Sequence, residues 1–445
     1  MPSSLLDRLF LAGTAVALMA PAAARAQIPT ITLEDAIRLS RGVNPGVVQA
    51  AGSVRNAEAA VRSASLGAYL PSITASTSGN RSFSESARPG PTGDIISGGR
   101  STNSVNLGLS ANMELFTGFR RGADTRAAKA TRASAEASLT DQQFQVNLST
   151  TQAFFDALSA QQLITVREAS VKRAEEQLNL SVAKLRVGSA TRSDSLRSVV
   201  NLGNARLALV QTQSDVARTQ AALGRAVGLE TRVAAADDST FYDAPITLDT
   251  AVVSAEALSH SPTVQATMAS EDAARASLRS SRSAYWPTLS LTANTNWSGN
   301  NNNDIGGTEI PNYKLYNNRQ ISLGLNWTLF NRFQREQTIV NRLSALDVAE
   351  AQARDTRRSV QSSLTTQFAA LDAAALRIDI TAASVLAAAE DLRVVNERYR
   401  VGAATILDVL TSQEALQQAE VDVVNARFDY LRAKAQLEAL IGRRL

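Results

Sequence analysis

A short motif occurs twice in this chain, as AYLPSI at residues 68–73 and as AYWPTL at residues 284–289. In both places it separates a stretch with helical periodicity from a stretch in which apolar and polar residues alternate. The two prolines are 216 positions apart (287 minus 71), and a later Val-Gly pair recurs 214 positions apart, at residues 187–188 and 401–402. Because the two offsets differ by only two residues, they predict an internal duplication in which two units share one architecture.

Each unit contains two alternating stretches, which predict strands at residues 72–83 and 104–116 and again at 288–297 and 319–330. Strict alternation is typical of a strand with one face in an apolar environment. Aromatic residues gather at the strand ends, which is typical of a membrane interface. The apolar positions expected to face lipid are Leu107, Leu109, Leu115, Leu289, Leu291, Leu323, Leu325, Trp327 and Leu329. Long polar loops are expected between paired strands, at 84–100 and 298–318.

Each strand pair is followed by a long segment without glycine or proline, residues 123–187 and 333–401. At 1.5 Å per residue, such a segment forms a helix of roughly 100 Å. Long helices are predicted at about 120–187 and 333–401, and return helices at about 191–227 and 405–441. The glycine of each Val-Gly pair supplies the turn between them.

The N-terminus has the pattern of a secretory signal peptide, with Arg8 before an apolar run and small residues up to Ala26. The alternative is an N-terminal membrane anchor, for which the run is short. Gln27 follows the expected cleavage site, so no lipid-anchor cysteine is present there. The predicted organisation is a signal peptide (1–26), a first repeat (27–229), a connector (230–247) and a second repeat (248–445).

Composition argues against several classes of function. The chain has no cysteine and a single histidine, His260, and it shows no phosphate-binding loop or catalytic triad. We therefore expect no enzymatic activity, cofactor or metal site. The net charge of +4 is spread along the chain without a basic block, so no nucleic-acid partner is expected.

Export combined with half-apolar strands of about ten residues indicates a β-barrel in the outer membrane. Four strands cannot close an open barrel, whereas three copies would supply twelve. The helices are too polar all round to lie in lipid and would project into the periplasm. A periplasmic or secreted coiled-coil structural protein is the rival interpretation, but it leaves the strand pairs unexplained.

The chain resembles the TolC family of outer-membrane efflux proteins over nearly its whole length. The resemblance is carried by the Tyr-x-Pro strand entries, by the Leu-Phe pair that closes each second strand, and by the tip segments LRVG (185–188) and YRVG (399–402). The sequence TILDVL at 405–410 continues the second tip. The resemblance implies a fold that is mainly α with β: a trimeric 12-stranded β-barrel on a 12-helix periplasmic α-barrel.

The resemblance also implies a function. The chain would be an exit duct that receives substrates from an inner-membrane pump through a periplasmic adaptor. Small-molecule efflux with an RND-type pump is the first expectation, and type I protein secretion with an ABC transporter is the alternative. The implied partners are two further copies of this chain, the adaptor, the pump and outer-membrane lipid.

Site residues follow from the same resemblance. Asp408, with Asp194 as its counterpart in the first repeat, would line the periplasmic entrance, and Tyr399 would help to hold it shut. An alternative is that both aspartates only stabilise the first turn of a helix. Three positions depart from the family pattern: Leu185, Thr411 and Ala404. The tips expected to contact the adaptor are Val187, Gly188, Ser189, Val401, Gly402 and Ala403.

Overall fold

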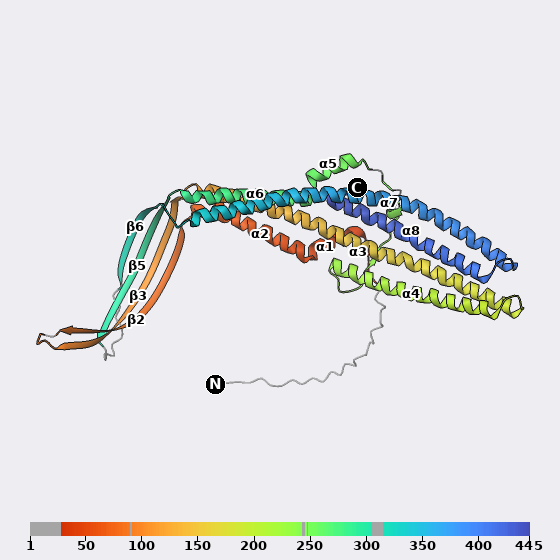
Figure 1. Cartoon of the computed structure of the whole chain (residues 1–445). Coiled ribbons are helices and arrows are strands. Elements are labelled where there is room, and N and C mark those ends of the chain that lie inside the picture. Colours follow the sequence, from red (N-terminus) through yellow and green to blue (C-terminus); the bar gives the residue numbers. More distant parts are fainter. Residues whose placement is uncertain (1–27, 90, 243–244, 247, 305–314) are drawn as a thin grey trace, which may run out of the picture.

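The computed structural model describes residues 28–89, 91–242, 245–246, 248–304 and 315–445. The protein is elongated, with a four-stranded sheet at one end and the turns of two helical hairpins at the other (Figure 1). The predicted signal peptide, residues 1–26, lies outside the described residues.

The two repeats have matching helices. In the first they are α1 (Leu33–Val43), α2 (Pro45–Ser65), α3 (Arg120–Arg186) and α4 (Arg192–Val227), and in the second α5 (Thr250–His260), α6 (Pro262–Ser281), α7 (Gln334–Arg400) and α8 (Ile406–Ile441). Short 3₁₀ turns occur at Gly67–Tyr69, Ser239–Tyr242 and Arg282–Tyr285. None of the described helices combines the length and apolar character that a membrane-crossing helix needs. A two-residue parallel pair, β1 (Thr30–Ile31) with β4 (Ala234–Ala235), ties the connector to the N-terminal segment.

The sheet contains β2 (Ser72–Pro89), β3 (Ile95–Phe116), β5 (Thr288–Asp304) and β6 (Tyr316–Asn326), antiparallel and in that order. Paired residues share one face of a sheet. The register places Leu109 opposite Ala75 and Thr295, and Leu291 opposite Met113 and Leu323. Near the helices, the apolar residues of the separate strands therefore combine into one apolar face, with Ser, Thr and Asn on the other. Farther from the helices the same face also carries Thr77, Thr295 and Arg319.

The strands of the first hairpin are longer than predicted. Most of the loop expected at 84–100 is strand, because backbone ladder bonds run from Ser72 to Pro89 without requiring apolar side chains. In the second hairpin β5 extends to Asp304 and β6 begins at Tyr316, and residues 305–314 lie outside the described part of the chain.

Three predicted lipid-facing positions need correction. β6 ends at Asn326, so Trp327 and Leu329 lie beyond the strand: β6 is an edge strand, and its partner β5 begins at Thr288, opposite Asn326. The Trp327 indole instead donates to the Tyr285 carbonyl, at 3.2 Å. Leu115 occupies an irregularity in register between Glu114 and Phe116, and Phe116 takes the position opposite Leu289.

The helices form two long hairpins, α3 with α4 and α7 with α8, and α3 also packs against α8 (Figure 1). One core cluster joins the repeats: Phe154 and Phe155 of α3 pack with Leu223 of α4 and Phe428 of α8. A second cluster holds Leu364 and Leu371 of α7 against Leu437 of α8. The predicted fold class, mainly helical with a duplicated unit of long antiparallel helices and four strands, is confirmed.

A left-handed turn joins each second strand to its long helix. In the first repeat Gly118 and Phe119 have φ of 62° and 65°, and in the second Arg332 and Phe333 have φ of 58° and 62°. A Cβ on Gly118 would lie 2.5 Å from that of Trp286, so the close approach of Trp286 requires glycine there, whereas Arg332 adopts a similar φ in the second repeat. Phe119 packs edge-on against both Phe116 and Trp286, with ring centroids 5.4 Å apart in each pair. This junction fixes the direction of the helices relative to the sheet.

Candidate functional site at the helical hairpin tips

Both predicted tip segments lie at the end of the molecule opposite the sheet (Figure 1). Each helix ends in a left-handed glycine, Gly188 with φ 76° and Gly402 with φ 80°. The next amide in each turn donates back to the helix, from Ser189 to the Lys184 carbonyl (2.9 Å) and from Ala403 to the Arg398 carbonyl (2.7 Å). These bonds close the helix ends and leave one apolar side chain projecting from each tip. Val187 is 78% exposed and Val401 is 80% exposed.

The two aspartates predicted at the entrance occupy identical local positions. Asp194 and Asp408 are each the third residue of a return helix. Each forms a capping box with the threonine that directly precedes its helix. The Asp194 carboxylate accepts from the Thr191 amide at 2.9 Å. The Asp408 carboxylate accepts from both the amide and the hydroxyl of Thr405, at 2.8 Å each. Each aspartate thus has a role in starting its helix, which is compatible with a further role for the exposed charge.

These contacts also favour the charged form of Asp408. The hydrogen bonds from the Thr405 amide and hydroxyl, followed by the positive charge of Arg398, hold the pKa of Asp408 below its ordinary value. Since the folded-state pKa is lowered, this carboxylate stabilises the fold above its unfolded pKa, and the contribution is lost as the pH falls through the folded value. At neutral pH the group is ionised.

Tyr399 is buried at the second tip. It is 5% exposed and packs with Leu392, Ile406, Val409 and Leu416. Its hydroxyl is buried without a hydrogen-bond partner among the described residues. Its backbone carbonyl, in contrast, accepts a hydrogen bond from the Lys184 ammonium. The same ammonium lies 4.0 Å from the centroid of the Tyr399 ring.

Lys184 therefore links the α3–α4 hairpin to the α7–α8 hairpin close to their tips. Sequence reasoning missed this residue, because nothing local marks a contact across 215 positions. One signal was available. Lys184 directly precedes Leu185, which stands where the second repeat has Tyr399, so the difference between the repeats falls on the residues that make the contact.

Polar contacts continue between the hairpins above the tips, where α3 faces α8. Arg173 pairs with Glu420 through two hydrogen bonds, of 3.1 and 2.6 Å, and both side chains are roughly three-quarters buried. Ser170 donates to Gln417, and Asn201 of α4 donates to Gln413 at 3.3 Å. Polar pairs thus link α3 and α4 to α8 in this region. No group of three or more potential metal ligands occurs within the described ranges.

Comparisons with known proteins agree with this architecture. A profile of the family described as "Outer membrane efflux protein" matches residues 36–229 and 253–443. The outer membrane efflux protein BepC of Brucella suis is 27% identical over 380 residues, covering 84% of this chain and 78% of BepC. The outer membrane protein TolC of Escherichia coli is 25% identical over 357 residues, covering 77% of this chain and 70% of TolC. The crystal structure of the outer membrane protein VceC from Vibrio cholerae has a TM-score of 0.70 at 18% identity, covering 93% of this chain and 96% of VceC.

Proposed function

The chain belongs to the outer membrane efflux protein family and is therefore an efflux duct of the outer membrane and not an enzyme; from this premise we propose that three copies build one continuous channel. In this channel the sheets close a twelve-stranded barrel in the membrane, and the helices extend the duct into the periplasm. A cleaved signal peptide, residues 1–26, delivers each copy.

The observation that carries the proposal is the sheet itself. Its two outer strands, β2 and β6, are each paired on one side only, and one face is apolar across all four strands in the part of the sheet near the helices. Long unpaired edges are templates for further pairing. Four strands are too few to enclose a lumen, whereas twelve enclose one wide enough for water. Three copies joined edge to edge supply twelve strands and a lumen lined by Ser, Thr and Asn.

The helical part supports the same arrangement. α3 and α8 are in the middle of the chain's four long helices, so α4 and α7 form its two sides. Both sides expose apolar residues that a neighbouring copy would cover. They are Leu196, Val199, Val200, Leu207 and Val210 on α4, and Val340, Leu343, Val348, Leu376, Ile380 and Leu386 on α7.

The internal repeat predicts the register between copies. Within the chain, Asn112 of β3 pairs with Thr292 of β5, and the Thr292 hydroxyl donates to the Asn112 side chain at 3.1 Å. Adding the repeat offset of 214 to 112 gives Asn326 of β6, and subtracting 216 from 292 gives Ser76 of β2. Asn326 of one copy should therefore lie opposite Ser76 of the next.

A cysteine pair tests this register. The chain has no native cysteine, so Ser76→Cys combined with Asn326→Cys should oxidise in isolated outer membranes to covalent dimers and trimers. The control combines Asn326→Cys with Asn80→Cys, which moves the first thiol by four residues, about 13 Å along the strand. Cross-linking equal to that of the control, or covalent species larger than a trimer, would contradict the proposed assembly.

The partners belong to the same proposal. The tips, with exposed Val187 and Val401, would contact a periplasmic adaptor that links the duct to an inner-membrane pump. Small-molecule efflux with an RND-type pump is the preferred assignment, because the description of the family names efflux.

Capture in cells tests the partners. A photoactivatable cross-linker attached at Ser189→Cys or Ala403→Cys should trap an adaptor and a proton-driven pump, identified by mass spectrometry. The same reagent at Ser78→Cys, on the polar face of the sheet, should trap neither. Recovery of an ABC transporter would instead assign the duct to protein secretion, and capture of no adaptor at either tip would exclude tip-to-tip docking.

A further inference from the structure

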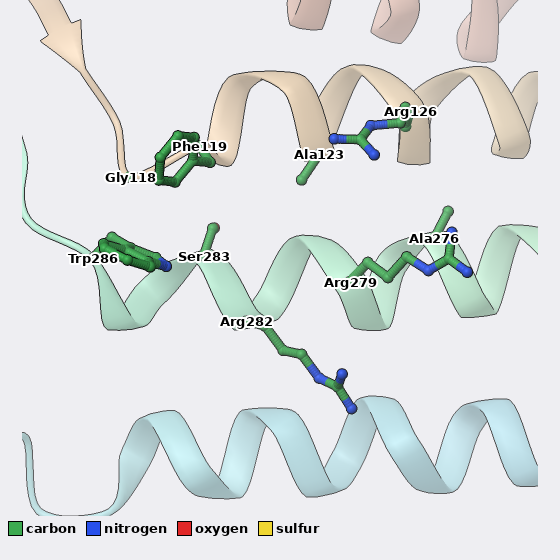
Figure 2. A pocket seen from close by; sticks show the side chains of 9 residues that line it. All are labelled: Gly118, Phe119, Ala123, Arg126, Ala276, Arg279, Arg282, Ser283 and Trp286. Carbon is green, nitrogen blue, oxygen red and sulfur yellow. The ribbon is translucent and has the colours of Figure 1, made fainter.

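A cavity of about 250 Å³ lies between the start of α3 and the end of α6, where the helices meet the sheet. Phe119 and Trp286 form one end of it, and Arg126, Arg279 and Arg282 extend from the two helices beside it (Figure 2). In this view Arg282 extends from α6 toward α7. The cavity thus combines an aromatic wall with the cationic side chains of Arg126 and Arg279, while Arg282 lies at its edge (Figure 2).

The aromatic wall is continuous with the apolar face of the sheet. Phe116 lies opposite Leu289 on that face, Phe116 contacts Phe119, and Phe119 contacts Trp286. Phe119 is 66% exposed and Trp286 is 56% exposed. If the apolar face contacts hydrocarbon, these rings lie at the level where aromatic side chains favour the headgroup region.

The cations beside this wall have free donors. Among the described residues, the side chains of Arg279 and Arg282 make no hydrogen bond or ion pair, and all three arginines are exposed. Arg126 uses only its Nε, which donates to the Gly122 carbonyl at 3.0 Å. Asp124, beside the lining residue Ala123, already lies 3.8 Å from Arg120 and accepts from Ser280. Guanidinium groups in this state can bind phosphate through two donors at once.

The three arginines of the cavity have no cationic counterparts in the internal repeat. The repeat offsets align Arg126 with Val340, Arg279 with Ser63 and Arg282 with Leu66. Trp286 aligns with Leu70. The left-handed turn and the adjacent Phe-Phe contact are the same in both repeats, at 5.4 Å. Each of the three arginines is therefore replaced by an uncharged residue in the repeat, although Arg332 occupies the counterpart of the lining residue Gly118.

We infer that this cavity binds the phosphate of an anionic phospholipid headgroup in the periplasmic leaflet of the outer membrane, with Arg126 and Arg279 as donors and Trp286 beside the glycerol and upper acyl chain. The inference rests on the proposed placement of the sheet in the membrane. A free phosphate ion would use the same donors but would gain nothing from the aromatic wall.

Native mass spectrometry of the intact assembly in a nonionic detergent tests the inference, with dimyristoyl phosphatidylglycerol as the probe and dimyristoyl phosphatidylcholine as the neutral comparison. The wild type should retain phosphatidylglycerol, and Arg126→Gln/Arg279→Gln should reduce this retention at least about fivefold through loss of charge-assisted bonds. The control Arg55→Gln/Arg357→Gln removes two exposed arginines of α2 and α7 whose side chains have no partner among the described residues, and retention should not change.

A second readout locates the lipid. With Trp297→Phe and Trp327→Phe, Trp286 is the single tryptophan left, and brominated phosphatidylglycerol should quench it more than brominated phosphatidylcholine does. Equal retention by wild type and the double arginine variant, or equal retention of the two lipids, would overturn the inference. Binding of inorganic phosphate without any lipid preference would replace it with a free-anion site. The Ser76–Asn326 cross-link, measured in the same preparations, separates failure of this inference from failure of the trimer.

Discussion

Replacing Lys184 by methionine is expected to open the periplasmic end of the channel. The ammonium of Lys184 donates to the Tyr399 carbonyl and lies 4.0 Å from the ring centroid, so it ties one hairpin tip to the other. A hydrogen bond from a charged donor and a cation–π contact together contribute about 2 kcal/mol. Losing them would shift the closed-to-open equilibrium of one tip roughly 30-fold.

Single-channel recording in planar bilayers measures this effect. Lys184→Met should show a larger conductance or longer openings than the wild type. Lys172→Met, which removes an exposed lysine whose side chain has no partner among the described residues, should behave as the wild type. Tyr399→Phe should also leave the channel closed, because the hydroxyl makes no hydrogen bond within the described chain. If Tyr399→Phe opens the channel and Lys184→Met does not, the tip is held by the hydroxyl and a neighbouring copy.

Asp408→Asn is expected to reduce cation selectivity without loosening the helix. In the proposed trimer, three ionised carboxylates around a narrow entrance would attract cations and exclude anions, so their removal should lower the cation-to-anion permeability ratio roughly tenfold. Asparagine keeps a side-chain oxygen that can still accept from the Thr405 amide. The selectivity change should therefore appear with only the small loss of thermal stability that removal of the charged form entails.

The companion variant Thr405→Val separates the two roles of Asp408. It removes the hydroxyl that donates to Asp408 and accepts from its amide, while the carboxylate stays in place. It should cost about 1 kcal/mol of helix stability and leave reversal potentials unchanged. If Asp408→Asn gives the wild-type reversal potential, the aspartate only caps its helix. Acidification should reduce selectivity in the wild type only at pH values below the ordinary carboxyl range, because the folded pKa is lowered.

Features with a local cause could be predicted from the sequence. The period of 3.6 in the helices, the period of two around Leu107 and Leu323, and the glycines of the tips each depend on neighbours in the chain. The extended first hairpin could not be predicted in this way. Beyond Phe83 the alternation stops, while the backbone ladder continues to Pro89.

Contacts across the repeats have no local signal either. Lys184 with Tyr399 and Arg173 with Glu420 join positions 215 and 247 residues apart. Trp327 shows a different error: it continues the alternation of β6, but β5 begins at Thr288, opposite Asn326, so Trp327 has no partner in β5. Pairing decides where an edge strand ends, and alternation alone cannot show where the partner begins. Both kinds of error arise where tertiary structure overrides a local pattern.

The connector between the repeats has a consequence for symmetry. The connector holds the two units on one chain, so the contact between α3 and α8 forms within one molecule, at a high effective concentration. Only the junctions between neighbouring chains depend on the concentration of free chains. Selection can then act on the intramolecular and intermolecular junctions separately. In the proposed trimer, a ring of six similar units would thereby have threefold symmetry, with the junction of Arg126 and Arg279 occurring three times and the junction of Val340 and Ser63 three times.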